Sequence, residues 1–103
     1  MRLSIFSFAA IVLLISNSVS AADDFNRTID RIGIQFNSPY VVFKESLSAS
    51  CGFVNLGSLN DAQTKAMYAG LLSARSTDNK VYHIGYTQNS DGTCTATSLE
   101  LGS

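Results

Sequence analysis

The sequence predicts a small α+β domain, mainly β with one helix, that follows an export signal. Several short stretches alternate apolar and polar side chains, as half-buried strands do. One longer stretch repeats apolar residues at three- and four-residue spacings, as an amphipathic helix does. The chain has 103 residues and two cysteines, which suits one domain with one modest core and one covalent bond across it.

The first residues have the layout of a secretory signal peptide. Arg2 supplies the charged end, residues 5–15 form the apolar run, and residues 19–21 (Val-Ser-Ala) are the small residues of a cleavage site. The apolar run is well short of the roughly 20 residues needed to cross a bilayer. We therefore expect residues 1–21 to be cleaved, and residues 22–103 to form a single secreted domain, periplasmic or extracellular, without a membrane anchor.

Cys51 and Cys94 are the two cysteines. In an oxidising compartment such a pair is far more often a disulfide than a metal or redox site. We expect a Cys51–Cys94 bond, and for its loop of about 40 residues the chain-entropy model gives roughly 4 kcal/mol of stabilisation. Loss of either cysteine should therefore threaten folding.

Three strands are predicted in the first half of the domain. Residues 28–37 alternate apolar and polar side chains, and residues 40–43 are rich in β-formers. Residues 37–39 (Asn-Ser-Pro) have turn chemistry, so these two strands are expected to form a hairpin. The short apolar segment 51–56, closed by a glycine, is predicted to be the third strand.

A single helix is predicted to follow Asn60 and to end at about Ser76. Asn60 is the expected N-cap, with Asp61 in the first turn, where the helix dipole favours an acid, and with Gln63 completing a capping box. The predicted core face is mostly small, which lets a helix lie close against a sheet. This face consists of Ala62, Ala66, Met67, Gly70, Leu71 and Ala74.

Two more strands are predicted after the helix. Residues 80–86 are β-rich, and residues 94–101 alternate again after the strong turn signal Asp91-Gly92. The expected faces of the first of these strands are Tyr82, Ile84 and Tyr86 on one side and Val81, His83 and Gly85 on the other.

The predicted element order is therefore β-β-β-α-β-β. A helix between the third and fourth of five short strands is the connectivity of the OB-fold, a five-stranded, partly open barrel. The expected disulfide fits this architecture, because it would tie the start of the third strand to the start of the fifth. An α+β sandwich built from the same elements is the alternative.

Few residues suggest catalysis. His83 is the only histidine, and no recognised nucleophile motif accompanies it, so a structural or surface role is expected. With both cysteines in a disulfide, the chain offers no thiolate nucleophile and no zinc ligand cluster. We expect no catalytic residue, cofactor or metal. The acids are scattered, and Asp23 and Asp24 are expected at a frayed new terminus.

The charge argues against a nucleic-acid binder. The chain has seven Lys and Arg against eight Asp and Glu, and Arg2 leaves with the signal peptide, so the exported part is slightly acidic and has no basic face. Tyrosines that could stack on a sugar or stand at a protein interface are present instead. They are Tyr40, Tyr68, Tyr82 and Tyr86.

The order of elements and the placement of the cysteines resemble a known family. The likeness runs from Cys51 to Leu101 and includes the helix segment 66–74 (Ala-Met-Tyr-Ala-Gly-Leu-Leu-Ser-Ala), then Lys80-Val81, and Cys94 at the start of the last strand. In this layout the chain is similar to small secreted bacterial proteins related to the OB-fold B subunits of AB-type toxins, of the subtilase-cytotoxin and pertussis-like kind.

That resemblance implies a function without catalysis. Such B subunits assemble into five-membered rings, bind cell-surface glycans and carry a catalytic A subunit, so the expected partners are a glycan, further copies of the chain in a homopentamer and an A-type subunit. Several weak sites on one ring give avidity. No matching sugar-binding residue can be assigned from the sequence.

Two other functions stay open from the sequence. The first is a monomeric periplasmic protein of structural or stress-related type, which would share the fold and the disulfide. The second is a small secreted enzyme, in which His83 would be the obvious general base.

Overall fold

The computed structural model describes residues 20–102. Most of the predicted signal peptide, residues 1–19, lies outside the described residues. Its last two positions, Ser20 and Ala21, belong to the first strand, so the predicted cleavage point falls inside that strand. No helix in the described part of the chain is long and apolar enough to cross a membrane.

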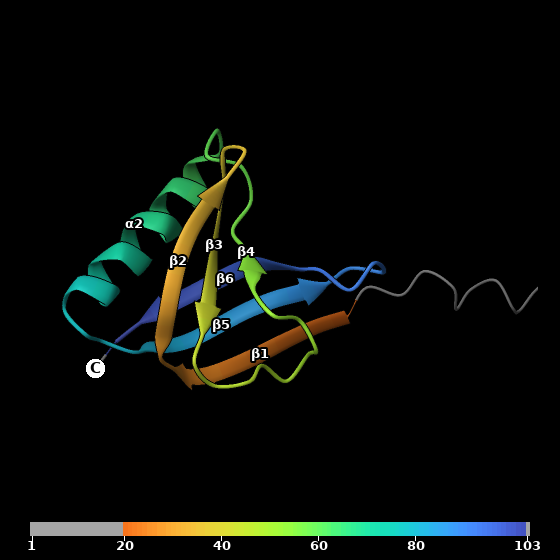
Figure 1. The fold of residues 1–103 in the computed structure, drawn as a ribbon, viewed down its shortest axis with the longest axis horizontal. Helices are drawn as coiled ribbons and strands as arrows, with labels where there is room; N and C mark the ends of the chain where they lie inside the picture. The colour runs from red at the N-terminus through yellow and green to blue at the C-terminus, as the bar shows by residue number, and fades with distance from the viewer. Residues whose placement is uncertain (1–19, 103) are drawn as a thin grey trace, which may run out of the picture.

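Residues 20–102 form a six-stranded mixed sheet with one helix (Figure 1). The strand order in the sheet is β1-β5-β6-β4-β3-β2. Neighbours are antiparallel except for β4 and β6, which are parallel. The elements are β1 (Ser20–Arg27), β2 (Ile29–Gln35), β3 (Ser38–Phe43), β4 (Val54–Asn55), α2 (Ala62–Ser76), β5 (Val81–Gln88) and β6 (Cys94–Leu101).

Thr28 joins the two edge strands of the sheet. β1 and β2 lie at opposite ends of the strand order but are separated by this one residue. Its amide donates to Glu45 Oε1 at 2.6 Å, its hydroxyl donates to Glu45 Oε2 at 2.7 Å, and its carbonyl accepts from the Lys44 amide at 2.9 Å. The chain therefore bends at Thr28, and β2 and β3 run steeply across β1 and β5 (Figure 1).

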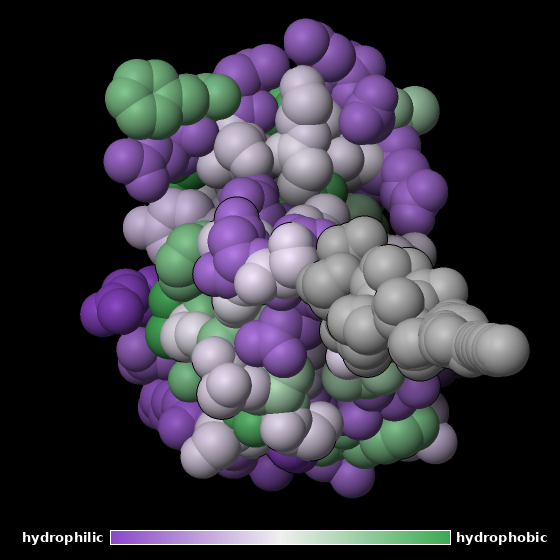
Figure 2. Space-filling view, turned by 90° about the vertical axis from the view of Figure 1, so that its right-hand side faces the viewer, coloured by the Kyte–Doolittle hydropathy of each residue, from purple (hydrophilic) through white to green (hydrophobic). Residues whose placement is uncertain are grey.

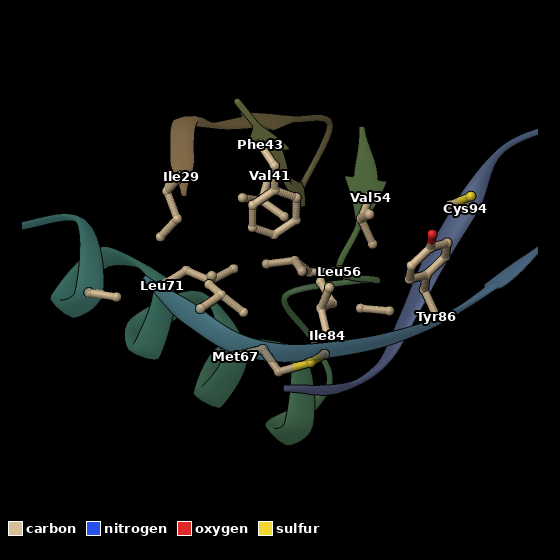
Figure 3. Close-up of a cluster of buried hydrophobic side chains, with 13 residues drawn as sticks. Ile29, Val41, Phe43, Val54, Leu56, Met67, Leu71, Ile84, Tyr86 and Cys94 are labelled. Atoms are coloured by element: carbon tan, nitrogen blue, oxygen red, sulfur yellow. The ribbon is translucent and has the colours of Figure 1, made fainter. Parts of the chain in front are cut away.

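The core fills the space between the two parts of the bent sheet and α2 (Figure 3). Side chains from β2, β3 and β4 face others from β5, β6 and the helix. The helix buries Thr64, Met67, Leu71 and Ala74. The buried apolar residues are Ile29, Val41, Phe43, Val54, Leu56, Met67, Leu71, Ala74, Val81, Ile84, Tyr86, Cys94 and Ala96.

The structure confirms a mainly β domain with one helix, but it has six strands where five were predicted. The additional strand is β1, and it pairs with β5 from Ser20 to Arg27. The expectation that Asp23 and Asp24 lie at a frayed terminus is wrong, because both are in this ladder and Asp24 is buried. Polar and charged residues dominate β1, so its sequence lacks the apolar alternation that identifies a strand.

Two more predictions differ in detail. The third strand is confined to Val54–Asn55, because only these two residues pair with β3 and β6. The N-cap of α2 is Asp61 rather than Asn60, and no side chain caps it. The predicted end of the helix at Ser76 is confirmed. Its core face is shifted, since Ala62 and Ala66 are exposed while Thr64 is buried.

The predicted faces of β5 are correct in placing Ile84 and Tyr86 together, but wrong at the start of the strand for Val81 and Tyr82. Val81, Ile84 and Tyr86 are buried, whereas Tyr82 is half exposed. The register slips between Val81 and His83, which pair with Leu101 and Glu100. Tyr82 is thus the extra residue of a β-bulge, which reverses the alternation on either side of it.

The disulfide between Cys51 and Cys94 is confirmed, with a Cα–Cα distance of 6.1 Å. Cys94 is the first residue of β6 and is fully buried, and Cys51 lies in the loop before β4. The bond therefore joins the loop that leads into β4 to the first residue of β6, which lies opposite Val54 in the parallel β4–β6 ladder.

We expect the Cys51→Ala/Cys94→Ala double variant to lose about 4 kcal/mol of unfolding free energy, because its unfolded chain regains the freedom that the bond removes. Urea denaturation of the oxidised wild type and the variant measures this loss. Wild-type protein treated with dithiothreitol serves as the control and should lose the same amount. An unchanged midpoint in both would contradict the prediction.

Candidate ligand-binding face

The bent sheet exposes one face of β2, β3 and β4 to solvent. Along β3, Pro39, Val41 and Phe43 are buried, so the alternate residues point outward. The register brings together on this outer face Arg31, Gly33 and Gln35 of β2, Ser38, Tyr40 and Val42 of β3, and Asn55 of β4.

Tyr40 lies flat on this face because its neighbour on β2 is a glycine. Gly33 is directly opposite Tyr40 in the register. A Cβ atom at Gly33 would overlap the phenol ring, with Tyr40 Cε1 only 2.7 Å away. Any side chain at position 33 would therefore push the ring away from the sheet.

Phe53 completes an aromatic pair with Tyr40. The ring centroids are 5.4 Å apart and the planes meet at 63°, an edge-to-face arrangement. Phe53 is 42% exposed although it is large and apolar. We call Tyr40 and Phe53 the aromatic platform.

Polar groups surround the aromatic platform. The Ser38 hydroxyl donates to Asn55 Oδ1 at 2.6 Å and also lies 2.9 Å from the Gly57 carbonyl. This bond fixes the Asn55 amide, whose nitrogen has no hydrogen-bond acceptor in the described part of the chain. Gln35 and Arg31 are exposed on the same face, and Arg31 forms no ion pair within residues 20–102. The face thus combines an apolar ring surface with hydrogen-bond donors, of which the Asn55 amide is held in place by Ser38.

His83 lies on a different face, between two acids. Its Nε2 atom is 2.8 Å from Asp23 Oδ1, and its Nδ1 atom is 2.9 Å from Glu100 Oε1 but outside hydrogen-bond geometry. Phe25 stacks on the imidazole with centroids 4.8 Å apart. The Asp23 contact and the stacked Phe25 ring orient the imidazole, and within the described residues it has no hydroxyl or thiol partner.

A buried carboxylate fastens the loop between β3 and β4. Asp24 accepts hydrogen bonds from the Tyr86 hydroxyl at 2.5 Å, the Ser48 amide at 3.0 Å and the Ser48 hydroxyl at 2.7 Å, and Arg27 lies 3.0 Å away. The Tyr86 oxygen in turn accepts from the Ala49 amide at 3.2 Å. These bonds hold the loop against β1 and β5.

The same network shifts two pKa values. Burial raises the pKa of Asp24, but the hydrogen bonds from Tyr86 and Ser48 and the charge of Arg27 outweigh it, so the pKa lies below its ordinary value of 3.8. Burial and the Asp24 carboxylate both raise the pKa of Tyr86. Asp24 is therefore ionised and Tyr86 protonated at neutral pH.

The four tyrosines singled out in the sequence do not form one site. Tyr40 is on the aromatic platform and Tyr86 is buried. Tyr68 is partly buried against the core. Tyr82 contacts Phe25 edge-to-face, with centroids 5.8 Å apart. Phe53 and Gly33 were not predicted as site residues.

No cluster of three or more acidic, histidine or cysteine side chains that could hold a metal ion occurs among residues 20–102. Exposed hydrophobic residues form small separate groups among hydrophilic ones on the side seen in Figure 2. Comparison with protein-family models, with curated proteins and with solved structures found no match.

We expect Asp24→Asn to lower the unfolding free energy at pH 7 by about 2 kcal/mol, because an amide nitrogen would face donors that now have a carboxylate acceptor. Since the folded pKa is depressed, the carboxylate stabilises the protein above pH 3.8 and this contribution is lost as the pH falls through the lowered folded value.

Urea denaturation between pH 2 and pH 7 tests this assignment. The wild type should lose stability steeply below about pH 4, and Asp24→Asn should show a shallower decline. Tyr86→Phe is the matched control, because it removes one donor and keeps the carboxylate. Parallel pH profiles for wild type and Asp24→Asn would show that Asp24 contributes nothing to acid sensitivity.

Proposed function

We propose that the protein is a secreted, non-enzymatic binding module that recognises glycans through the outer face of β2, β3 and β4. The observation that supports this proposal is the aromatic platform, in which Tyr40 lies flat over Gly33 and contacts Phe53 edge-to-face. A flat aromatic ring accepts the apolar face of a sugar, and adjacent amide and guanidinium donors suit sugar hydroxyls. Asn55, Gln35 and Arg31 supply such donors here.

An OB-fold interpretation of the sheet supports the same location. If β1 and β2 are counted as one strand bent at Thr28, the strands number five and the helix lies between the third and the fourth. In OB-folds the face of the second and third strands binds oligonucleotides or oligosaccharides. These strands correspond to β3 and β4, which carry Tyr40 and Asn55. The slight negative charge favours the oligosaccharide.

The resemblance to toxin B subunits adds multivalency to this proposal. A homo-oligomer would present several copies of the face to one cell surface and would gain avidity without any new contact. An A-type catalytic partner would then supply the chemistry. A monomeric periplasmic protein with the same fold is the competing function, and it requires no exposed aromatic platform.

We expect the exported protein to bind a subset of immobilised oligosaccharides on a glycan array. Tyr40→Ala and Phe53→Ala should each weaken binding to the best of these glycans about 10-fold, because each removes aromatic contact worth about 1.5 kcal/mol. Leu72→Ser is the matched control, since Leu72 is 45% exposed on α2, away from this face. Equal binding by all three variants would exclude the aromatic platform as the site.

Gly33→Ala tests the platform without removing a ring. The added methyl group should lift Tyr40 from the sheet and lower glycan affinity, although both aromatic side chains remain. Titration of the same glycan measures the affinity, and circular dichroism verifies that the strand structure is kept. Unchanged affinity in a folded Gly33→Ala protein would mean that the flat ring is not used.

Export can be tested directly on the processed chain. Expression in a Gram-negative bacterium should yield periplasmic protein whose intact mass lacks residues 1–21, because the small residues before Ala22 suit signal peptidase. A chain that keeps its N-terminus and stays in the cytoplasm would contradict secretion.

A further inference from the structure

The tip of the β2–β3 hairpin presents a phenylalanine in an unusual position. Phe36 and Asn37 form the two-residue turn between Gln35 and Ser38, and both have positive φ, 50° and 64°. Two-residue turns of this kind favour Asn-Gly, because a bulky residue is strained at positive φ. Phe36 is also 93% exposed. Single exposed apolar residues are ordinary, but strain and near-complete exposure together indicate a functional contact.

The hairpin tip is held in place by its surroundings. The Asn37 carbonyl accepts from the Leu59 amide at 3.0 Å, and the Asn37 amide group lies 3.5 Å from Asn60 Oδ1. The loop before α2 therefore supports the turn. Phe36 is presented by a pre-organised element, so little ordering entropy is lost when it binds.

A hollow of about 390 Å³ lies between the start of α2 and β6. The buried apolar side chains that line it, and so form its floor, are Leu56, Met67 and Ala96, and the more exposed polar residues Asp61, Thr95 and Thr97 line its rim. We call these six residues the α2–β6 hollow. Gln63 also lines the hollow and donates to the Thr97 carbonyl at 3.0 Å. The hollow is large enough for a phenyl ring, and Phe36 of the same chain does not occupy it, because that ring is almost wholly exposed.

We propose that Phe36 of one copy docks into the α2–β6 hollow of a second copy of this chain. The two surfaces match in polarity. The tip offers the amide donors of Gln35 and Asn37, whereas the rim of the hollow offers the Asp61 carboxylate and two threonine hydroxyls. An aromatic anchor ringed by neutral polar groups is typical of interface hot spots.

A lipid bilayer is a poorer occupant for the same tip. The residues around Phe36 are Gln35, Asn37 and Ser38, with Asn60 beside them, and none is basic. One apolar side chain without basic neighbours gives little attraction to an anionic surface.

The proximity of tip and hollow allows two kinds of symmetric contact. The Asn37–Leu59 hydrogen bond places the tip beside the segment that leads into α2, and the tip and the first turn of the helix lie at the same end of the molecule (Figure 1). One partner can therefore exchange both contacts in a two-fold dimer, while a one-way contact would build a ring. If the proposed glycan binding holds, assembly would raise avidity by joining several binding faces, and in this respect the inference rests on the proposed function. The contact between the two copies itself needs no glycan.

Light scattering over a range of concentrations tests the contact. The wild type should show a mass of two or more chains, and Phe36→Asn should weaken association at least about 30-fold. Because asparagine tolerates positive φ, Phe36→Asn should also raise the melting temperature of the dilute monomer. Phe36→Leu keeps both apolar character and strain and should still associate. Leu72→Ser is the control for a general loss of apolar surface.

A mixing experiment identifies the two surfaces. Thr97→Arg fills the rim of the hollow and should be monomeric, like Phe36→Asn. Mixed together, the two variants should form a one-to-one pair, because one keeps the ring and the other keeps the hollow. A mixture that stays monomeric overturns the proposal. So does a monomeric wild type, or a Phe36-dependent sedimentation of the monomer with phosphatidylcholine vesicles. If the wild type is monomeric but still binds glycan, the docking contact is overturned and the proposed function stays intact.

Discussion

The bend at Thr28 is the constraint on which the rest of the fold depends. One continuous segment supplies both edge strands, and it can do so because Thr28 leaves the ladder and pairs with Glu45 and Lys44 instead. Burial raises the pKa of Glu45, but the two bonds from Thr28 outweigh it and keep this pKa below 4.5. The carboxylate is thus charged at neutral pH and holds the bend with charge-assisted bonds, which are stronger than neutral ones.

The loop that follows β3 carries the second half of the candidate site. It has no regular structure, yet three independent connections fix it: Glu45 to Thr28, Ser48 and Ala49 to the Asp24–Tyr86 pair, and Cys51 to Cys94. Phe53 comes two residues after the last of these. The exposed Phe53 ring is therefore pre-organised by contacts between this loop and residues of β1, β5 and β6.

Local patterns in the sequence predicted those elements whose formation depends mainly on neighbouring residues. The helix and its end at about Ser76 were predicted because the apolar spacing is helical and residues 77–79 (Thr-Asp-Asn) end it, although its N-cap and its buried face differ from the prediction. The disulfide was predicted because two cysteines in an export context leave one pairing. β1 was missed because Asp23 and Asp24 carry no strand signal. Asp24 is tolerated inside because Tyr86 and Ser48, distant in sequence, donate to it and Arg27 pairs with it. The bulge at Tyr82 was missed for a similar reason, because it depends on the pairing of β5 with β6.

The candidate site could not be predicted from the same patterns, because it depends on the register of the hairpin. The sequence favoured a turn at residues 37–39, whereas the chain turns at Phe36 and Asn37. Moving the turn by one residue would place Gly33 opposite Val42, and Tyr40 would then lie against Gln35. The turn that strains Phe36 is therefore also the turn that lays Tyr40 over Gly33. The position of this two-residue turn therefore determines both the aromatic platform and the exposed tip. Because asparagine tolerates the same turn, Phe36→Asn should leave the register and the platform unchanged while removing the apolar contact of the tip.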